Sequence, residues 1–205
     1  MFLERRFFML MPADLQDVFD KNNGILQTST AEQAGLSRAI LAKYANSGLI
    51  ERISHGVYIP AGEIDDEIYS MQLRAKKLIF SHETALFLHG LSDRTPFRHS
   101  VTVPSGYKPS SVIKAVSKVF YIKPELFELG KTTAQTTMNH LVFTYDIERT
   151  ICDVVRSRNK MDHQIVNDAL KRYTSLKTAD FNKLYSYASQ LGINNVLQKY
   201  LEVLL

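Results

Sequence analysis

The chain has 205 residues, of which 45% are hydrophobic and 22% charged, and its 25 basic and 21 acidic side chains give a net charge of +4 at pH 7. These proportions are typical of a globular protein and exclude disordered, collagen-like and low-complexity chains. The apolar stretches are far shorter than the roughly 18 residues that a bilayer-spanning helix needs, so we expect no membrane segment.

The N-terminal residues 1–11 carry Arg5 and Arg6 before a short apolar patch. A secretory leader has a similar start, but no small-residue cleavage pattern follows here. We therefore expect the protein to stay in the cytoplasm.

The next part of the chain predicts three helices, separated by glycines that favour turns. In chain order the predicted helices cover residues 12–22, 28–34 and 37–47, with an extended link at 25–27. Ser29 or Thr30 is the expected N-cap of the second helix, and Ser37 that of the third. The three helices predict a small helical domain.

The third predicted helix has two different sides when residues are placed at 100° intervals. The apolar side carries Ile40, Leu41, Tyr44 and Ala45. The other side carries Arg38, Ala42, Lys43 and Asn46. Because a helix fits the DNA major groove and its outward polar residues reach base edges, we interpret Arg38, Lys43 and Asn46 as DNA-contacting residues.

A two-stranded hairpin is predicted directly after this helix, from residues 49–53 and 57–60 with Gly56 in the turn. Arg52 and His55 lie on this hairpin and are candidates for contact with flanking phosphates. Helix, short helix, helix and hairpin is the order of a winged helix-turn-helix. We therefore predict a DNA-binding domain of this type over residues 1–62.

Two other interpretations fit the same pattern. The polar side of the third helix is also what the solvated face of any small helical domain looks like. Residues 1–62 carry six basic and six acidic side chains, a net charge of zero, although DNA-binding domains are commonly basic. A module that binds a partner protein, without sequence-specific DNA binding, is therefore the alternative.

Residues 63–205 predict a second domain of the α+β class, in which a small sheet precedes a series of helices. The predicted elements are a helix at 65–77, strands at 78–80, 99–104, 117–122 and 139–145, short helices after Ser81 and from Ser110, and helices from 147 onward. The predicted fold class of the whole chain is α+β, with an N-terminal winged helix-turn-helix domain and a mixed C-terminal domain ending in helices.

The sequence predicts no catalytic, cofactor or metal site, so we do not expect an enzyme. The six histidines have no metal-ligand spacing, no phosphate-binding loop occurs, and Cys152 is the single cysteine, which excludes an intrachain disulfide. Ser81 and His82 are adjacent and are expected to point apart on a helix. Cys152 is expected to be a small core residue.

Arg149 and Asp153 have the spacing of an ion pair on one helix. They belong to a basic segment, residues 149–177, with seven cations and three acids. Such a segment is usually a solvated helix face, but it also suits phosphate contacts or an acidic partner. The sequence leaves these interpretations open.

Four motifs in one order carry a resemblance to a known family: "GLIERISHGVYIP" at 48–60, "SHETALFLHGL" at 81–91, "VTVP" at 101–104 and "YDIERTICDVVR" at 145–156. The chain resembles the AbiEi antitoxins, partners of nucleotidyltransferase-like AbiEii toxins in abortive-infection systems that defend bacteria against phage.

This resemblance implies that the N-terminal domain represses its own operon by binding inverted repeats in promoter DNA. It implies that residues 63–205 form an antitoxin domain that counters the toxin. The family is usually classed as type IV, in which no stable complex with the toxin is required. DNA contact is assigned to Arg38, Lys43, Asn46, Arg52 and His55, whereas the resemblance assigns no residue to toxin neutralisation.

Overall fold

The computed structural model describes residues 11–204, and the chain divides into two compact units, residues 1–70 and 71–205. The division falls inside helix α4 (Glu67–Arg74), and the domain boundary expected after Gly62 stays a prediction. Most of the N-terminal segment considered as a leader lies outside the described residues. Within residues 11–204, no helix is both long and apolar enough to cross a bilayer.

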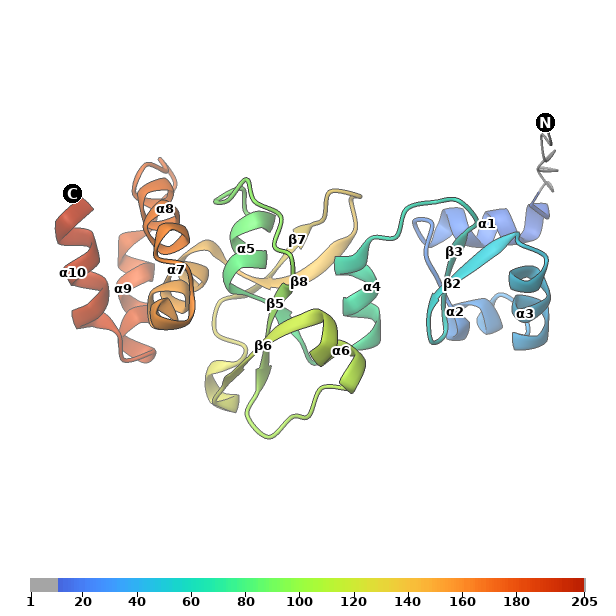
Figure 1. The fold of residues 1–205 in the computed structure, drawn as a ribbon, viewed down its shortest axis with the longest axis horizontal. Helices are drawn as coiled ribbons and strands as arrows, with labels where there is room; N and C mark the ends of the chain where they lie inside the picture. Colours follow the sequence, from blue (N-terminus) through green and yellow to red (C-terminus); the bar gives the residue numbers. More distant parts are fainter. Residues whose placement is uncertain (1–10, 205) are drawn as a thin grey trace, which may run out of the picture. The chain divides into compact units, whose positions relative to one another are not determined.

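The described part of the first unit, up to the start of α4, contains three helices and a three-stranded antiparallel sheet (Figure 1). Its elements in chain order are α1 (Ala13–Lys21), β1 (Leu26–Gln27), α2 (Thr28–Gln33), α3 (Arg38–Asn46), β2 (Ile50–Ser54) and β3 (Val57–Pro60). Strand β3 lies between β1 and β2 in the sheet. The predicted succession of three helices and a hairpin is therefore confirmed.

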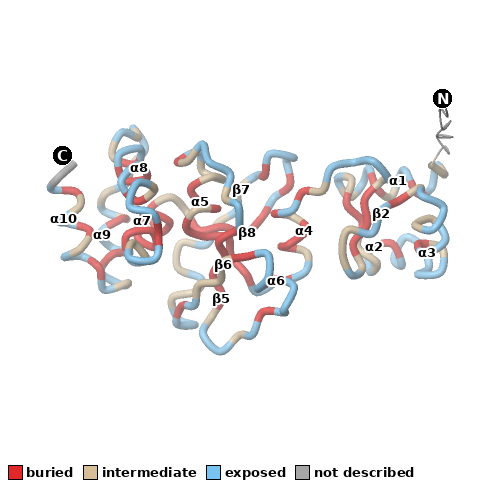
Figure 2. The backbone as a smooth tube through the Cα atoms, viewed as in Figure 1, coloured by how far each residue is buried: buried red, intermediate tan, exposed pale blue. Residues whose placement is uncertain are grey.

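A small apolar core holds this unit together. Leu15 and Phe19 of α1, Leu26 of β1 and Leu41 of α3 are almost completely buried in it. Burying each of these side chains contributes roughly 1.5–3 kcal/mol. In Figure 2 each helix of the unit has buried segments alternating with exposed ones, as expected for amphipathic helices.

The start of α2 differs from the prediction. The helix begins at Thr28 with Gln27 at the N-cap position, so Ser29 and Thr30 lie inside the helix and do not cap it. The Thr28 N–H donates instead to the carbonyl of Gly56 at 2.8 Å. The hairpin turn, which is distant in sequence, thus supplies the hydrogen-bond partner that a local cap was expected to supply.

The second unit is built on a five-stranded mixed sheet with the strand order β6-β5-β4-β8-β7. Its strands are β4 (Ile79–Phe80), β5 (His99–Pro104), β6 (Ser117–Ile122), β7 (Lys131–Gln135) and β8 (Leu141–Tyr145). The pairs β4–β8 and β5–β6 are parallel, and β4–β5 and β7–β8 are antiparallel. A sheet with helices after it agrees with the predicted α+β class.

The helices of this unit gather mainly in its C-terminal part (Figure 1). They are α5 (His82–Leu88), α6 (Ser111–Val116), α7 (Ile147–Arg156), α8 (His163–Thr174), α9 (Phe181–Gln190) and α10 (Asn194–Leu204), with short 3-10 turns η1 (Pro124–Leu126) and η2 (Arg158–Lys160). Leu86 of α5 joins Ile151 of α7, Leu170 of α8 and Leu197 of α10 in one apolar core. The helical C-terminal part predicted from residue 147 onward is confirmed.

Two elements of the second unit depart from the prediction. Helix α4 covers residues 67–74 and not 65–77: the Asp66 carboxylate accepts from the Tyr69 N–H at 3.1 Å at the start of the helix, and a turn follows Arg74. The side chain of Gln72 connects the helix to the sheet. Its amide Oε1 accepts from the Phe143 N–H at 2.9 Å, and its Nε2 donates to the Leu78 carbonyl at 3.4 Å. Strand β7 was not predicted, since its sequence, Lys-Thr-Thr-Ala-Gln, is polar and lies at the sheet edge.

Candidate nucleic-acid interface

Helix α3 presents a continuous exposed side. Its start is fixed by Ser37, whose Oγ accepts a hydrogen bond from the Ile40 N–H at 3.3 Å, so the predicted cap is confirmed. Arg38, Ala42, Lys43 and Asn46 are all exposed, whereas Leu41 is fully buried. The three polar residues predicted for DNA contact therefore share the outward side of one helix.

Arg38 is held in place by an acid on the preceding helix. Its Nε donates to Oε1 of Glu32 at 2.8 Å, and 79% of the Arg38 side chain is exposed. The bond occupies one edge of the guanidinium and leaves the terminal groups Nη1 and Nη2 accessible. The sequence analysis missed Glu32, because the partners lie on different helices and no local spacing rule connects them.

The hairpin brings the other two predicted residues together. Arg52 lies on β2, where its Nε donates to the Ser54 carbonyl at 3.2 Å and its Nη2 lies 2.9 Å from Nδ1 of His55. Because a guanidinium can only donate, the imidazole accepts at Nδ1 and carries its proton at Nε2. Both side chains are exposed, so they form a polar pair beside the hairpin turn.

The hairpin turn is anchored on the rest of the unit through Gly56. This residue has a φ of +72°, which favours glycine, and a Cβ here would lie 3.1 Å from Oγ1 of Thr28. Its carbonyl accepts from the Thr28 N–H, as described above. The position of Arg52 and His55 is thus coupled to the start of α2.

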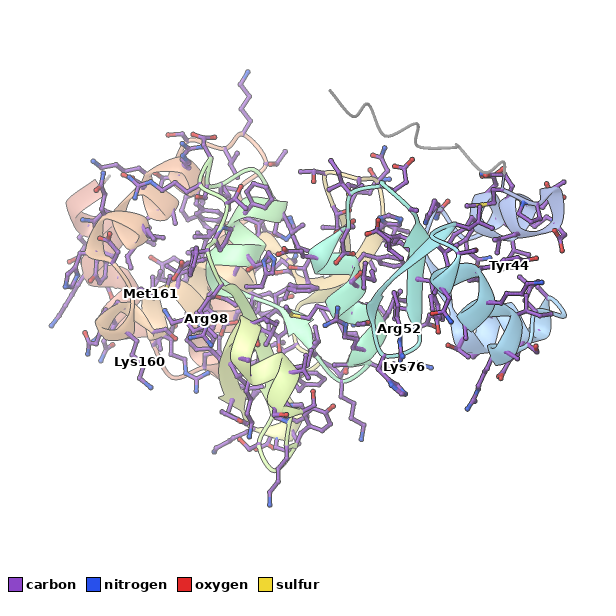
Figure 3. All side chains as sticks on the ribbon, turned by 45° about the vertical axis from the view of Figure 1, so that its right-hand side comes forward. Tyr44, Arg52, Lys76, Arg98, Lys160 and Met161 are labelled. Carbon is purple, nitrogen blue, oxygen red and sulfur yellow. The ribbon has the colours of Figure 1, made fainter. Side chains whose placement is uncertain are left out.

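A groove of about 520 Å³ lies between α3 and the hairpin. It is lined by Ala42, Ala45 and Asn46 of α3, by Ile50, Glu51 and Arg52 of β2, and by Tyr58 of β3. Figure 3 labels Arg52 on β2 and Tyr44 on α3. Of the five predicted residues, the groove brings Asn46 and Arg52 together, whereas Arg38, Lys43 and His55 do not line it.

The electrostatics of the two units differ. Residues 1–70 carry six basic and ten acidic side chains, a net charge of −4, whereas residues 71–205 carry nineteen basic and eleven acidic ones, a net charge of +8. The three cations of α3 and the hairpin, Arg38, Lys43 and Arg52, therefore belong to a unit whose net charge is negative.

The second unit contains a buried polar cluster around His82. Nδ1 and Nε2 of this imidazole lie 2.9 Å from the hydroxyl groups of Ser81 and Ser157, respectively, and the Ser81 hydroxyl accepts from Thr102 at 2.8 Å. The expectation that Ser81 and His82 point apart was wrong. Ser81 is extended and His82 has a φ of +49°, so the two residues are not successive positions of a regular helix.

Burial lowers the pKa of His82 well below its ordinary value, and the positive charges of Lys118, Arg149 and Arg156 lower it further. The imidazole is therefore neutral at pH 7. Its ring stacks on Phe120 with 3.5 Å between the ring centroids. This cluster ties α5, the sheet and the end of α7 together.

Arg149 is completely buried, and its predicted ion pair with Asp153 is confirmed at 3.2 Å. Its Nη1 also donates to the carbonyls of Leu126 and Leu129, and its guanidinium stacks on Tyr145 at 4.1 Å. Burial raises the pKa of Asp153, and the Arg149 charge opposes that rise. Arg149 is thus a core residue and not part of a solvated face, while Arg156, Lys160, Lys171, Arg172 and Lys177 are exposed.

Residues 11–204 contain no group of three or more histidine, cysteine or acidic side chains that could hold a metal ion. Cys152 is buried, as expected, and burial with the nearby Asp153 charge raises the pKa of its thiol to about 12. Such a thiol is protonated at pH 7 and is a poor nucleophile.

Residues 14–61, which cover the three helices except Ala13 and the whole hairpin, match a family of transcriptional regulators. The family is described as "Transcriptional regulator, AbiEi antitoxin", so the predicted resemblance is confirmed over this segment, which is similar to the AbiEi antitoxin regulators. No curated protein matches the sequence.

The fold of the chain is similar to that of the RV2827C protein from Mycobacterium tuberculosis, whose crystal structure superimposes with a TM-score of 0.50. The similarity covers 93% of this chain and 81% of that chain, at 13% sequence identity. At this identity the comparison concerns the fold alone.

Proposed function

We propose that residues 14–61 form a winged helix-turn-helix and that the protein binds inverted repeats in the promoter of its own operon and represses it. The observation that carries the proposal is the exposed side of α3, where Arg38, Lys43 and Asn46 face outward beside a hairpin that carries Arg52 and His55. A helix with this polar side fits the major groove, and a basic hairpin beside it reaches the flanking phosphates.

We further propose that residues 63–205 act as the antitoxin domain. In this proposal the domain counters a nucleotidyltransferase-like toxin in phage defence, as a type IV antitoxin that needs no stable complex with the toxin, and the protein acts in the cytoplasm without being an enzyme. The family description of residues 14–61 supports an antitoxin and regulator role.

A gel-shift titration of the full chain against the DNA upstream of its own gene tests the repressor proposal. We expect salt-sensitive binding that is tighter for this DNA than for unrelated DNA of the same length. The variant Arg38→Ala with Lys43→Ala should lose this binding. Lys21→Ala, which removes an exposed cation from α1, is the matched control and should bind like the wild type. Equal binding to both DNAs would contradict the proposal.

The alternative function, a module that binds a partner protein, is favoured by the net charge of −4 on residues 1–70. An acidic unit is repelled by DNA as a whole, although local cations can overcome this. Co-purification with the product of a neighbouring gene, together with no binding to promoter DNA, would establish this alternative.

A further inference from the structure

Among the exposed cations of the first unit, Arg38 has a distinctive position and a distinctive contact. It is the first residue of α3, and in helix-turn-helix proteins the N-terminal residues of the recognition helix contact base edges. Its Nε is bonded to Glu32 on the preceding helix at 2.8 Å. The helix start places the side chain, and the carboxylate accepts a hydrogen bond from its guanidinium.

The guanidinium nitrogens of Arg38 that are not bonded to Glu32 indicate which DNA group the side chain binds. An arginine whose Nε–H is engaged still offers donors on Nη1 and Nη2, and a guanine presents two acceptors, O6 and N7, in the major groove. This pairing is the commonest specific contact between a side chain and a base. A planar guanidinium whose Nε is hydrogen-bonded to a carboxylate loses less conformational entropy when it binds than a freely rotating one.

A generic electrostatic role does not explain Glu32. A carboxylate close to DNA repels the phosphates and partly neutralises Arg38, so it lowers the affinity for any DNA sequence. We propose that Glu32 is a positioning residue that presents Arg38 to a guanine in each half-site of the operator. The acid thus lowers the affinity for all DNA and raises the discrimination in favour of the operator sequence. This inference rests on the proposed DNA-binding function.

Lys43 lies on the same side of α3 and serves as an internal comparison. An ammonium group is a flexible point charge without the planar fork that matches a guanine. Lys43 is therefore assigned to a phosphate, and its loss should weaken binding to all DNA sequences by a similar factor.

The test is a selection of bound sequences from a pool of randomised duplex DNA, made with the full chain. The proteins compared are the wild type, Glu32→Ala, Glu32→Gln, Arg38→Ala and Lys43→Ala. We expect the wild-type motif to contain a guanine position that is lost with Arg38→Ala and kept with Lys43→Ala. Equilibrium titrations of this motif, and of the motif with that guanine replaced, then give the discrimination factor, which should be roughly 5- to 150-fold for the wild type.

The two Glu32 variants separate orientation from charge. Both remove the acid, so both should bind unrelated DNA more tightly than the wild type. Glu32→Gln keeps an oxygen that accepts from Nε and should retain the discrimination, whereas Glu32→Ala should lower it several-fold. Thermal melting of each variant checks that the unit remains folded.

Wild-type discrimination in Glu32→Ala would overturn the inference and leave the repressor proposal intact, provided that Arg38→Ala still loses the guanine position. A wild-type protein that selects no motif at all would overturn both the inference and the proposed function.

Discussion

Nε2 of His82 and the hydroxyl of Ser157 lie 2.9 Å apart, although 75 residues separate them in the sequence. The contact joins the first residue of α5 to the residue that ends α7. Since the imidazole is buried and surrounded by positive charges, it remains neutral in the folded protein. The stability of the second unit should therefore depend on pH through this residue.

We expect the free energy of unfolding to fall as the pH is lowered below about 6.5, the ordinary pKa of histidine. The folded-state pKa of His82 lies well below this value, so in acid the unfolded chain gains a proton that the folded chain does not. His82 thus contributes stability at neutral pH that is lost as the pH falls, by up to about 1.4 kcal/mol per pH unit.

Urea denaturation of the wild type and of His82→Gln at pH 7.5, 6.5 and 5.5 measures this effect. The variant removes the titrating group but keeps a polar side chain, so its stability should fall less steeply in acid. Parallel pH profiles for the two proteins would show that His82 does not carry the dependence.

Arg149→Met should destabilise the second unit by about 3–5 kcal/mol, because it leaves the buried carboxylate of Asp153 without its counter-charge. Arg149→Met combined with Asp153→Leu should recover part of that loss. Arg172→Met is the control: its ion pair with Asp93 is exposed, so the unfolding free energy should change far less. Equal losses for the two single variants in urea denaturation would contradict the role of burial.

Gly130→Ala should be more destabilising than Gly106→Ala. Both glycines have a positive φ, +74° and +88°, so any side chain costs roughly 1–2 kcal/mol at either position. At Gly130 the new Cβ would also lie 2.6 Å from Cβ of Arg149, whereas at Gly106 no atom lies within 4 Å. The clash should increase the destabilisation by Gly130→Ala by about 1–3 kcal/mol, as measured by thermal or urea unfolding. Similar losses of unfolding free energy for the two variants would contradict the effect of the clash.

Arg52→Ala should reduce the salt dependence of promoter binding. A cation that contacts one phosphate contributes about 0.9 to the slope of log K against log salt, so the slope should fall by about one unit. His55→Ala removes the side chain that lies against Nη2 of Arg52 but keeps the arginine charge, so it should change the slope less than Arg52→Ala. Binding isotherms at several salt concentrations measure both slopes, with Lys21→Ala as the reference. An unchanged slope for Arg52→Ala would show that this residue does not contact a phosphate.

Cys152 should be unreactive toward thiol reagents in the folded protein at pH 8. Its pKa of about 12 leaves almost no thiolate, and the side chain is buried. Ellman's reagent should detect one thiol per chain in urea and essentially none without it. Rapid labelling of the native protein would contradict the buried, protonated thiol.

The elements near the proposed interface were predictable because their signals are local. Ser37 caps α3 through a residue three positions further along, and the hairpin follows from two short β-rich runs around Gly56. Arg52 and His55 are three residues apart, so the turn alone brings them together. The exposed side of α3 follows from helical periodicity.

The features that were missed depend on contacts between distant parts of the chain. The Glu32–Arg38 pair requires the angle between α2 and α3, and strand β7 exists because β8 pairs with it. The His82 cluster depends on a backbone φ of +49°, in a region that non-glycine residues adopt uncommonly and that no local pattern indicates here. Sequence patterns describe the preferences of a segment, whereas these features come from its surroundings.

The strand order of the second unit has a consequence for the growing chain on the ribosome. The first unit is complete at residue 70, whereas β4 needs both β5 and β8, and β8 ends only at Tyr145. Domains form as units from the N-terminus during synthesis. A nascent chain that ends between residue 70 and Tyr145 therefore carries a complete first unit. Its strand β4, if already synthesised, has an unpaired edge that can pair with a wrong strand.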